Sequence, residues 1–216
     1  MNTSLDPISL IVVFGLMALV PTAVVVTTTF LKISVVMMLL RNALGVQQIP
    51  PNVALYGLSL ILTAYIMAPV GQRIYEITLK SPVNTKSIEG FMGAVRKGAE
   101  PMRAFLEKNS RPDQRDFFVR TTQTIWGPEL AADVKPNDFL VLMPAFLVSE
   151  LTSAFQIGFL IYLPFMVIDL IVSNILLALG MMMVSPVTIT LPLKLFLFVS
   201  VDGWTRLIHG LVLTYA

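Results

Sequence analysis

Apolar residues dominate both ends of the chain, and most of the charged residues lie between them. In the N-terminal part, residues 1–72, an apolar segment runs from about Ile8 to Leu40 and is interrupted by Pro21 and Lys32. Long apolar runs of this kind are typical of helices that are buried or that lie in a membrane. We therefore predict that this part is helical and associated with a membrane.

A turn separates this segment from a second apolar run. Ile49 precedes Pro50 within the stretch 43–52, and a residue before proline is biased away from the helical conformation. The run that follows, 53–70, has 18 residues, which is long enough for a helix to span a bilayer. The pattern thus indicates two apolar segments joined by a turn.

The middle of the chain, residues 73–137, is charged and follows a helical pattern. Two sets of residues recur there at helical spacing: Ile88, Phe91, Met92 and Val95, and then Phe117, Phe118, Thr121 and Ile125. Pro101 and Pro112 stand where prolines often open new helices. We expect a small, folded helical lobe that faces solvent.

The C-terminal part, residues 138–216, is predicted to form a helical hairpin. Asp138 is a candidate N-cap for a long apolar segment that ends near Leu179. The last apolar segment, 191–201, has about eleven residues, whereas a spanning helix needs roughly 20. We interpret 181–192 as the tip of a re-entrant hairpin, since non-helical backbone at membrane depth must be buried in protein or line a cavity.

Three adjacent methionines, Met181, Met182 and Met183, occupy this tip. Neighbours in sequence point to different faces of a helix, so three flexible side chains in a row do not serve one helix face. They either fill a core, as methionine often does, or form an adaptable apolar constriction that excludes water. A seal around chains of varied sequence would need that adaptability.

Five polar residues interrupt the apolar parts: Lys32, Glu150, Asp169, Asn174 and Lys194. A charge at the centre of a bilayer costs roughly 2.5–3.5 kcal/mol, so these buried polar side chains are expected to face a cavity, another subunit or one another. Three roles stay open, namely structural ion pairs, the lining of a conduit, and proton or ion chemistry. We select Glu150 and Lys194 as the ion pair because both lie in the half that forms the hairpin. The pair could close within one chain or between two.

Composition indicates a protein that is covered by a membrane or by partners. Of the 216 residues, 56% are hydrophobic and 13% are charged, compared with about 25% charged in a typical soluble domain. A net charge of +2 without a basic patch argues against nucleic-acid binding. No positive region precedes Asp6, the first charge, so the N-terminus does not resemble a cleaved signal peptide.

Nothing in the sequence favours an enzyme. The single histidine, His209, is isolated, the chain has no cysteine, and motifs for a metal, a nucleotide or a nucleophilic serine do not occur. We expect no cofactor and no metal site. The alternative to a channel-forming role is a stand-alone proton-coupled membrane transporter that uses Glu150 or Asp169, although no inverted repeat supports it.

Three stretches resemble the FliP/YscR family of type III secretion export-gate proteins. They are LLRNALGVQQIPPN at 39–52, MPAFLVSELTSAFQIGFLIYLPFMVIDLIVSNILLALGMMMVSP at 143–186, and ITLPLKLFLFVSVDGW at 189–204. Together they cover nearly all of the chain outside the charged lobe. Flagellar members tend to begin with a signal and an extension, so this N-terminus resembles the injectisome branch of virulence and symbiosis systems.

The resemblance implies an all-α fold of membrane-associated hairpins with a small extramembrane lobe, assembled into a conical multi-subunit pore. It implies several copies, taken to be five, with FliQ/YscS-type and FliR/YscT-type subunits and a FlhB/YscU-type switch protein. Unfolded substrate proteins would pass through the centre of this assembly, which lies in or just above the bacterial inner membrane, towards its periplasmic side. In such a gate, Met181, Met182 and Met183 would form a gasket, and Glu150 and Lys194 an inter-subunit ion pair.

Overall fold

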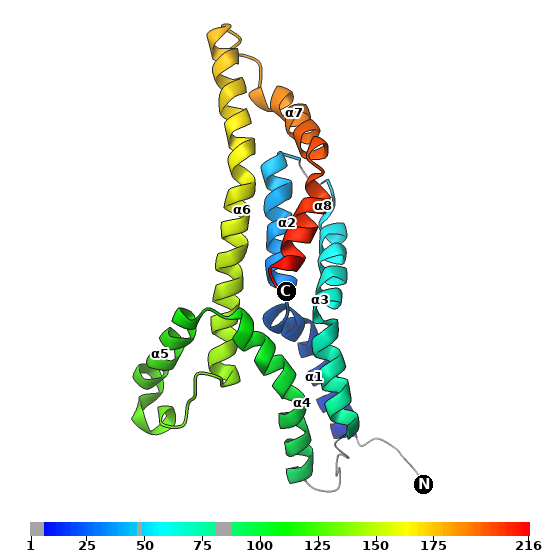
Figure 1. Cartoon of the computed structure of the whole chain (residues 1–216), viewed down its shortest axis with the longest axis vertical. Coiled ribbons are helices and arrows are strands. Elements are labelled where there is room, and N and C mark those ends of the chain that lie inside the picture. Colours follow the sequence, from blue (N-terminus) through cyan, green and yellow to red (C-terminus); the bar gives the residue numbers. More distant parts are fainter. Residues whose placement is uncertain (1–6, 47–48, 81–87) are drawn as a thin grey trace.

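The computed structural model describes residues 7–46, 49–80 and 88–216, and all regular structure within these ranges is helical (Figure 1). The all-α expectation is therefore confirmed. The helices are α1 (Pro7–Thr27), α2 (Phe30–Leu44), α3 (Asn52–Lys80), α4 (Ile88–Asn109), α5 (Pro112–Ala131), α6 (Phe139–Ala178), α7 (Pro186–Ser200) and α8 (Gly203–Leu213).

The molecule is elongated, and α6 runs along most of its length (Figure 1). With 40 residues at about 1.5 Å per residue, α6 is about 60 Å long. Pro144 and Pro164 lie inside this helix without ending it. The hairpin partner α7 packs against the upper part of α6, whereas α4 and α5 splay outward at its lower end. The connection between α6 and α7 forms the far tip of the molecule.

The core lies around α2, which is enclosed by α3, α6, α7 and α8. Two clusters of buried side chains surround it: Ile33, Val36, Met37, Leu55, Ala154 and Leu211 in one, and Leu40, Ala43, Leu44, Phe165 and Phe198 in the other. Gly158 allows α6 to approach α2 closely, because a Cβ at this position would lie 2.3 Å from Leu39 Cδ1. The sequence of α6 thus provides a smooth surface at the point where α2 crosses it.

Two sharp bends shape the bundle. The end of α1 meets α2 at 82°, and α7 meets α8 at 61°. The first bend falls at Thr28 and Thr29, which corrects our expectation of an interruption at Pro21. Both hydroxyls form hydrogen bonds there, Thr28 with the Val24 carbonyl and Thr29 with the Thr63 hydroxyl. Side-chain hydroxyls of this kind can satisfy polar groups that a broken helix leaves open.

The structure also corrects what we expected of α2, α3 and α4. α2 continues through Lys32 because the ammonium group is paired, and α3 continues past its apolar run to Lys80, since falling hydropathy does not end a helix. Pro101 lies buried inside α4 and not at its start, so packing there compensates for the missing hydrogen bond. Pro112 and Asp138 stand at the beginnings of α5 and α6, as predicted.

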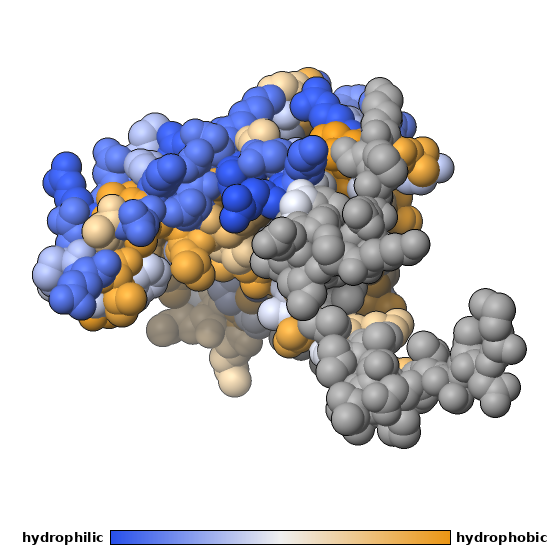
Figure 2. Space-filling view, turned by 90° about the horizontal axis from the view of Figure 1, so that it is seen from below, coloured by the Kyte–Doolittle hydropathy of each residue, from blue (hydrophilic) through white to orange (hydrophobic). Residues whose placement is uncertain are grey.

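The lobe consists of α4 and α5 and is attached to the lower end of α6. Leu106 of α4 is fully buried against Leu142 and Phe146 of α6. The backbone N–H of Arg111, between the two lobe helices, donates to the Ser149 hydroxyl at 2.9 Å. Figure 2 looks at this end of the molecule and shows hydrophilic side chains gathered over the lobe.

Only one of the two helical patterns predicted for the lobe can be compared with the structure. Phe117, Phe118, Thr121 and Ile125 all lie in α5, as their spacing predicted. Another group of predicted positions lies outside the part whose side chains the structure describes: Ile88, Phe91, Met92 and Val95. The N-terminal residues up to Asp6 are also outside the described ranges.

Within the described ranges, two helices are long and apolar enough to cross a membrane, namely Asn52–Leu79 and Phe139–Ala178. Each of the two bent helix pairs could supply one further span. In the most apolar window of each long helix only 17% of the residues are buried within the chain, so lipid or other protein must cover the remainder.

We expect Gly158→Val to destabilise the chain by about 1–3 kcal/mol, because the added side chain would overpack the contact between α2 and α6. The midpoint of thermal unfolding of the detergent-solubilised protein measures this effect. Gly71→Val is the matched control, since a Cβ at Gly71 of α3 meets nothing within 4 Å. Equal midpoints for the two variants would contradict a close approach at Gly158.

Candidate functional site

The tip of the α6–α7 hairpin is built by a helix-ending motif followed by a helix-starting one. Gly180 adopts a left-handed conformation with φ of 74°, and its N–H donates to Leu177 O at 3.0 Å. The Met181 N–H donates back to Leu176 O at 2.9 Å, which completes a Schellman motif. Pro186 then begins α7. The methionine triplet therefore occupies a non-helical loop, as predicted, but the loop ends at Ser185 and not at 192, because Pro186 starts α7 and residues 186–192 are helical.

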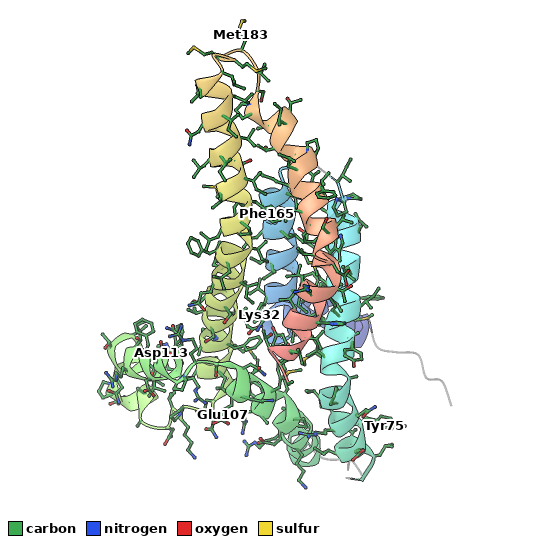
Figure 3. The ribbon with its side chains drawn as sticks, turned by 45° about the horizontal axis from the view of Figure 1, so that its top comes forward. Lys32, Tyr75, Glu107, Asp113, Phe165 and Met183 are labelled. Carbon is green, nitrogen blue, oxygen red and sulfur yellow. The ribbon has the colours of Figure 1, made fainter. Side chains whose placement is uncertain are left out.

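The methionine side chains project from this loop and are not packed within the chain. Their exposed fractions are 42% for Met181, 81% for Met182 and 102% for Met183. Figure 3 shows Met183 at the extreme end of the molecule. The part of α6 near the tip and the residue that follows it are also exposed, at Leu170, Ile171, Ile175, Leu177 and Leu179. Of the two readings of the triplet, core filling within the chain is excluded by this exposure.

An ion pair joins the two helices of the hairpin below the tip. Lys194 Nζ of α7 lies 2.6 Å from Asp169 Oδ2 of α6 and 3.3 Å from the Ala43 carbonyl oxygen. Ala43 lies in the last turn of α2, where carbonyl groups lack partners within the helix and carry partial negative charge. Lys194 is buried and Asp169 is half-exposed. Lys194 thus ties α7 to α6 through Asp169 and to α2 through the Ala43 carbonyl.

A second ion pair lies near the attachment of the lobe, where Figure 3 labels Lys32. Lys32 Nζ of α2 lies 3.1 Å from Glu150 Oε1 of α6, and both side chains are buried. The hydroxyl of Tyr215 donates to the other oxygen, Oε2. The Lys32 ammonium group lies 3.8 Å from the centroid of the Tyr215 ring, which adds a cation–π contact. Both carboxylate oxygens of Glu150 thus have partners.

Tyr215 stays a hydrogen-bond donor in this setting. It follows the end of α8, and burial together with the neighbouring Glu150 carboxylate raises the pKa of its hydroxyl well above the usual range. Neither its position near the C-terminal end nor its residue type singled it out in the sequence, and it was not among the predicted site residues.

The expected pair between Glu150 and Lys194 does not form within the chain. Glu150 and Asp169 are 19 residues apart on α6, which separates them by about 28 Å along the helix axis. Lys194 contacts Asp169 and therefore lies far from Glu150. Within one subunit the pairing is Lys32 with Glu150 and Lys194 with Asp169.

Two other candidate residues, Asn174 and His209, are exposed within the chain. Asn174, predicted to be buried, is exposed on the outer part of α6. His209 is also exposed and lines an apolar cleft between α3 and α8 together with Tyr65. Among the residues that the structure describes, no group of three or more histidine, cysteine or acidic side chains could hold a metal ion.

The VDGW stretch forms the bend that directs α8 back towards the core. Asp202 has a left-handed backbone with φ of 52°, and it accepts a hydrogen bond from the Thr205 hydroxyl at 3.0 Å. A Cβ at Gly203 would lie 2.2 Å from the Phe198 ring, so a side chain there would displace that ring. Trp204 meets the Phe198 ring edge to face, with centroids 5.4 Å apart.

The RNALG stretch closes α2 and connects it to α3. Gly45 ends α2 in the left-handed conformation, and its N–H donates to Asn42 O at 3.1 Å. Arg41 Nη1 donates to Asn52 Oδ1, the first residue of α3, at 2.6 Å. Gln47 and Gln48 of the same stretch lie outside the described residues.

Comparisons with known proteins match almost the whole chain. The model of the FliP family matches residues 13–211. "Yop proteins translocation protein R" of Yersinia pestis is 53% identical over 210 residues, covering 97% of each chain. "Probable translocation protein y4yL" of Sinorhizobium fredii is 48% identical, covering 99% of this chain and 97% of the relative. "Virulence protein YscR" of Salmonella typhimurium is 44% identical, covering 98% of each.

Double-mutant cycles test the observed pairing. The Lys32→Met and Glu150→Gln pair should show a coupling free energy of about 0.5–3 kcal/mol, because the two charges are in contact. Glu150→Gln and Lys194→Met are far apart in the chain and should be additive within about 0.5 kcal/mol. Denaturant unfolding of the detergent-solubilised single chain measures both values. Coupling between Glu150 and Lys194 but not between Lys32 and Glu150 would overturn this arrangement.

Proposed function

The chain belongs to the FliP family, and on this basis we propose that it is a core subunit of a type III secretion export gate. In this proposal, copies of the chain form the central conduit and its seal, through which unfolded proteins cross the bacterial inner membrane. The names of the relatives speak of translocation, and of virulence in one case, which supports protein export through an injectisome. The role is structural and not enzymatic.

The observation that carries the proposal is the exposed methionine tip. The loop 181–185 stands at the end of the α6–α7 hairpin. The Lys194–Asp169 pair joins the two helices of this hairpin, and Lys194 also bonds to the Ala43 carbonyl of α2. Thioether side chains are flexible and polarizable, so Met181, Met182 and Met183 can pack against surfaces of different shape. An apolar ring of such side chains can exclude water when closed, as hydrophobic constrictions do.

The length of α6 supports assembly into a multi-subunit complex. The hydrocarbon core of a bilayer is about 30 Å thick, whereas α6 is about 60 Å long. Large apolar side chains are exposed along this helix, including Phe155, Phe159, Leu163, Met166 and Ile175. Lipid tails cannot cover both halves of α6 unless the helix is strongly tilted, so protein would cover the part outside the hydrocarbon.

We propose that other copies of the chain cover this surface, in an assembly with five copies in total. The smaller FliQ/YscS-type and FliR/YscT-type subunits would cover the rest. A FlhB/YscU-type switch protein would join them. We propose that the assembly lies in or just above the inner membrane, towards the periplasmic side, as in the family that the sequence resembles. The long apolar helices would lie in the membrane or against other subunits, and the lobe projects from the lower end of α6. Neither a cofactor nor nucleic acid has a part in this proposal.

The ion pairs argue against the transporter alternative. A proton carrier needs a carboxylate that can gain and lose its proton during transport. Glu150 contacts Lys32 and Tyr215, and Asp169 contacts Lys194, so both candidate acids already have cationic or donor partners. We assign these acids to holding the helices together.

Replacing Met181, Met182 and Met183 by alanine should raise the leak of small solutes through the assembled gate several-fold and leave the amount of complex unchanged. The reason is that shortening the side chains widens the constriction without touching the helices that pack the core. Ion conductance across a planar bilayer that contains purified complex measures the leak. Met17→Ala, at an exposed methionine of α1, is the control. A triple variant as impermeable as the parent would falsify the gasket role.

The native mass of the detergent-purified chain, expressed alone and then with the neighbouring secretion genes, tests the assembly. We expect a defined homo-oligomer that gains mass when the small subunits are present, because the exposed apolar surface of α6 requires cover. Native mass spectrometry gives both the copy number and the partners. A monomer that ignores its neighbours would return the transporter to consideration.

A further inference from the structure

Tyr215, in the chain segment after α8, contacts three other helices, namely α2, α4 and α6. It follows α8 and so stands at the end of the hairpin arm formed by α7 and α8. Its hydroxyl donates to Glu150 on α6, and its ring carries the Lys32 ammonium group of α2 at 3.8 Å. Figure 1 shows the C-terminal end beside α2, close to the junction of α4 with α6.

The same residue also contacts the lobe. The Phe105 ring of α4 stacks on the Tyr215 ring, with centroids 6.3 Å apart and planes 22° apart. Lys108 Nζ of α4 reaches the carbonyl oxygens of Tyr215 at 3.4 Å and Ala216 at 3.3 Å. Phe105 in turn meets Phe146 of α6 edge to face, at 5.8 Å.

We propose that Tyr215 is a positioning residue with two separable contacts, a hydroxyl that fixes the end of the hairpin arm to α6 and a ring that fixes it to the lobe. Through this residue, a displacement of the lobe displaces the base of the hairpin whose tip carries the methionines. The proposal deepens the export-gate function and rests on it for the meaning of that movement. The two contacts themselves are properties of the single chain.

The chemistry of the contacts explains why they are separable. The hydroxyl bond to Glu150 is charge-assisted and directional, so it is lost when the oxygen is removed. The ring contacts with Phe105 and Lys32 depend on the aromatic face and persist in phenylalanine. Tyr215→Phe therefore breaks the contact with α6 alone, whereas Tyr215→Leu also removes the ring contact with the lobe and leaves only the Lys108 bonds to the backbone oxygens.

The test uses distances between spin labels in the assembled complex, and the natural chain offers a clean background because it has no cysteine. One label is attached at Leu213→Cys, in α8, and is paired either with Val167→Cys in α6 or with Lys97→Cys in α4. All three positions are exposed. The first pair reports the position of the hairpin arm relative to α6, and the second reports its position relative to the lobe.

In Tyr215→Phe we expect the distance distribution between α8 and α6 to widen and that between α8 and α4 to stay narrow. The displaced population should rise at least about tenfold, since a hydrogen bond to a charged group contributes at least that factor. In Tyr215→Leu both distributions should widen. Tyr75→Phe, which removes a hydroxyl from an exposed tyrosine of α3, is the matched control and should change neither.

Unchanged distributions in Tyr215→Phe would overturn the proposal, because a tyrosine that only fills space tolerates loss of its hydroxyl. Equal widening in both label pairs would also overturn it, since the two contacts would then not be separable. If Tyr215→Leu fails to assemble, the phenylalanine variant alone decides the question. The distances are measured without substrate, so their outcome is independent of whether the methionine tip seals a conduit.

Discussion

Opposite charges buried between apolar helices fix the arrangement of this fold. Lys32 and Glu150 are both buried, and removing one partner of such a pair typically costs about 3–5 kcal/mol because the other charge stays uncompensated. The apolar packing of α2 on α6 is fixed at one point by the close approach of Leu39 to Gly158. The ion pair adds a second, directional contact and sets the height at which the lobe, α2 and the end of α8 meet.

Much of the fold could be predicted from the sequence, because hydropathy and turn residues carry local information. The all-α fold, the starts of α5 and α6 and the non-helical methionine tip all follow from such signals. The first bend does not. A proline such as Pro21 marks a possible break, whereas the actual break lies at Thr28 and Thr29, where the Thr29 hydroxyl bonds to Thr63 of α3. The interior position of Pro101 likewise depends on packing that no local pattern reveals.

The pairing of the charges was missed although the sequence contains a signal for it. In an antiparallel hairpin, residues at equal distances from the tip lie opposite each other. Asp169 is 13 residues before Met182 and Lys194 is 12 residues after it. Glu150 is 32 residues before Met182 and Tyr215 is 33 residues after it. The hairpin register thus accounts for both observed contacts, while Lys32 reaches Glu150 from a helix outside the hairpin, which only tertiary structure could show.

The Schellman motif at Gly180 has a consequence for how fast a seal at the tip could respond. The helix end is closed by its own backbone hydrogen bonds immediately before the methionines, so side chains can move there without unwinding α6. Rotamer changes of exposed side chains take picoseconds to nanoseconds, whereas displacements of whole helices take microseconds or longer. In the proposed gate, methionines at the end of this closed helix would therefore follow the changing outline of a passing polypeptide residue by residue, with the slower helices at rest.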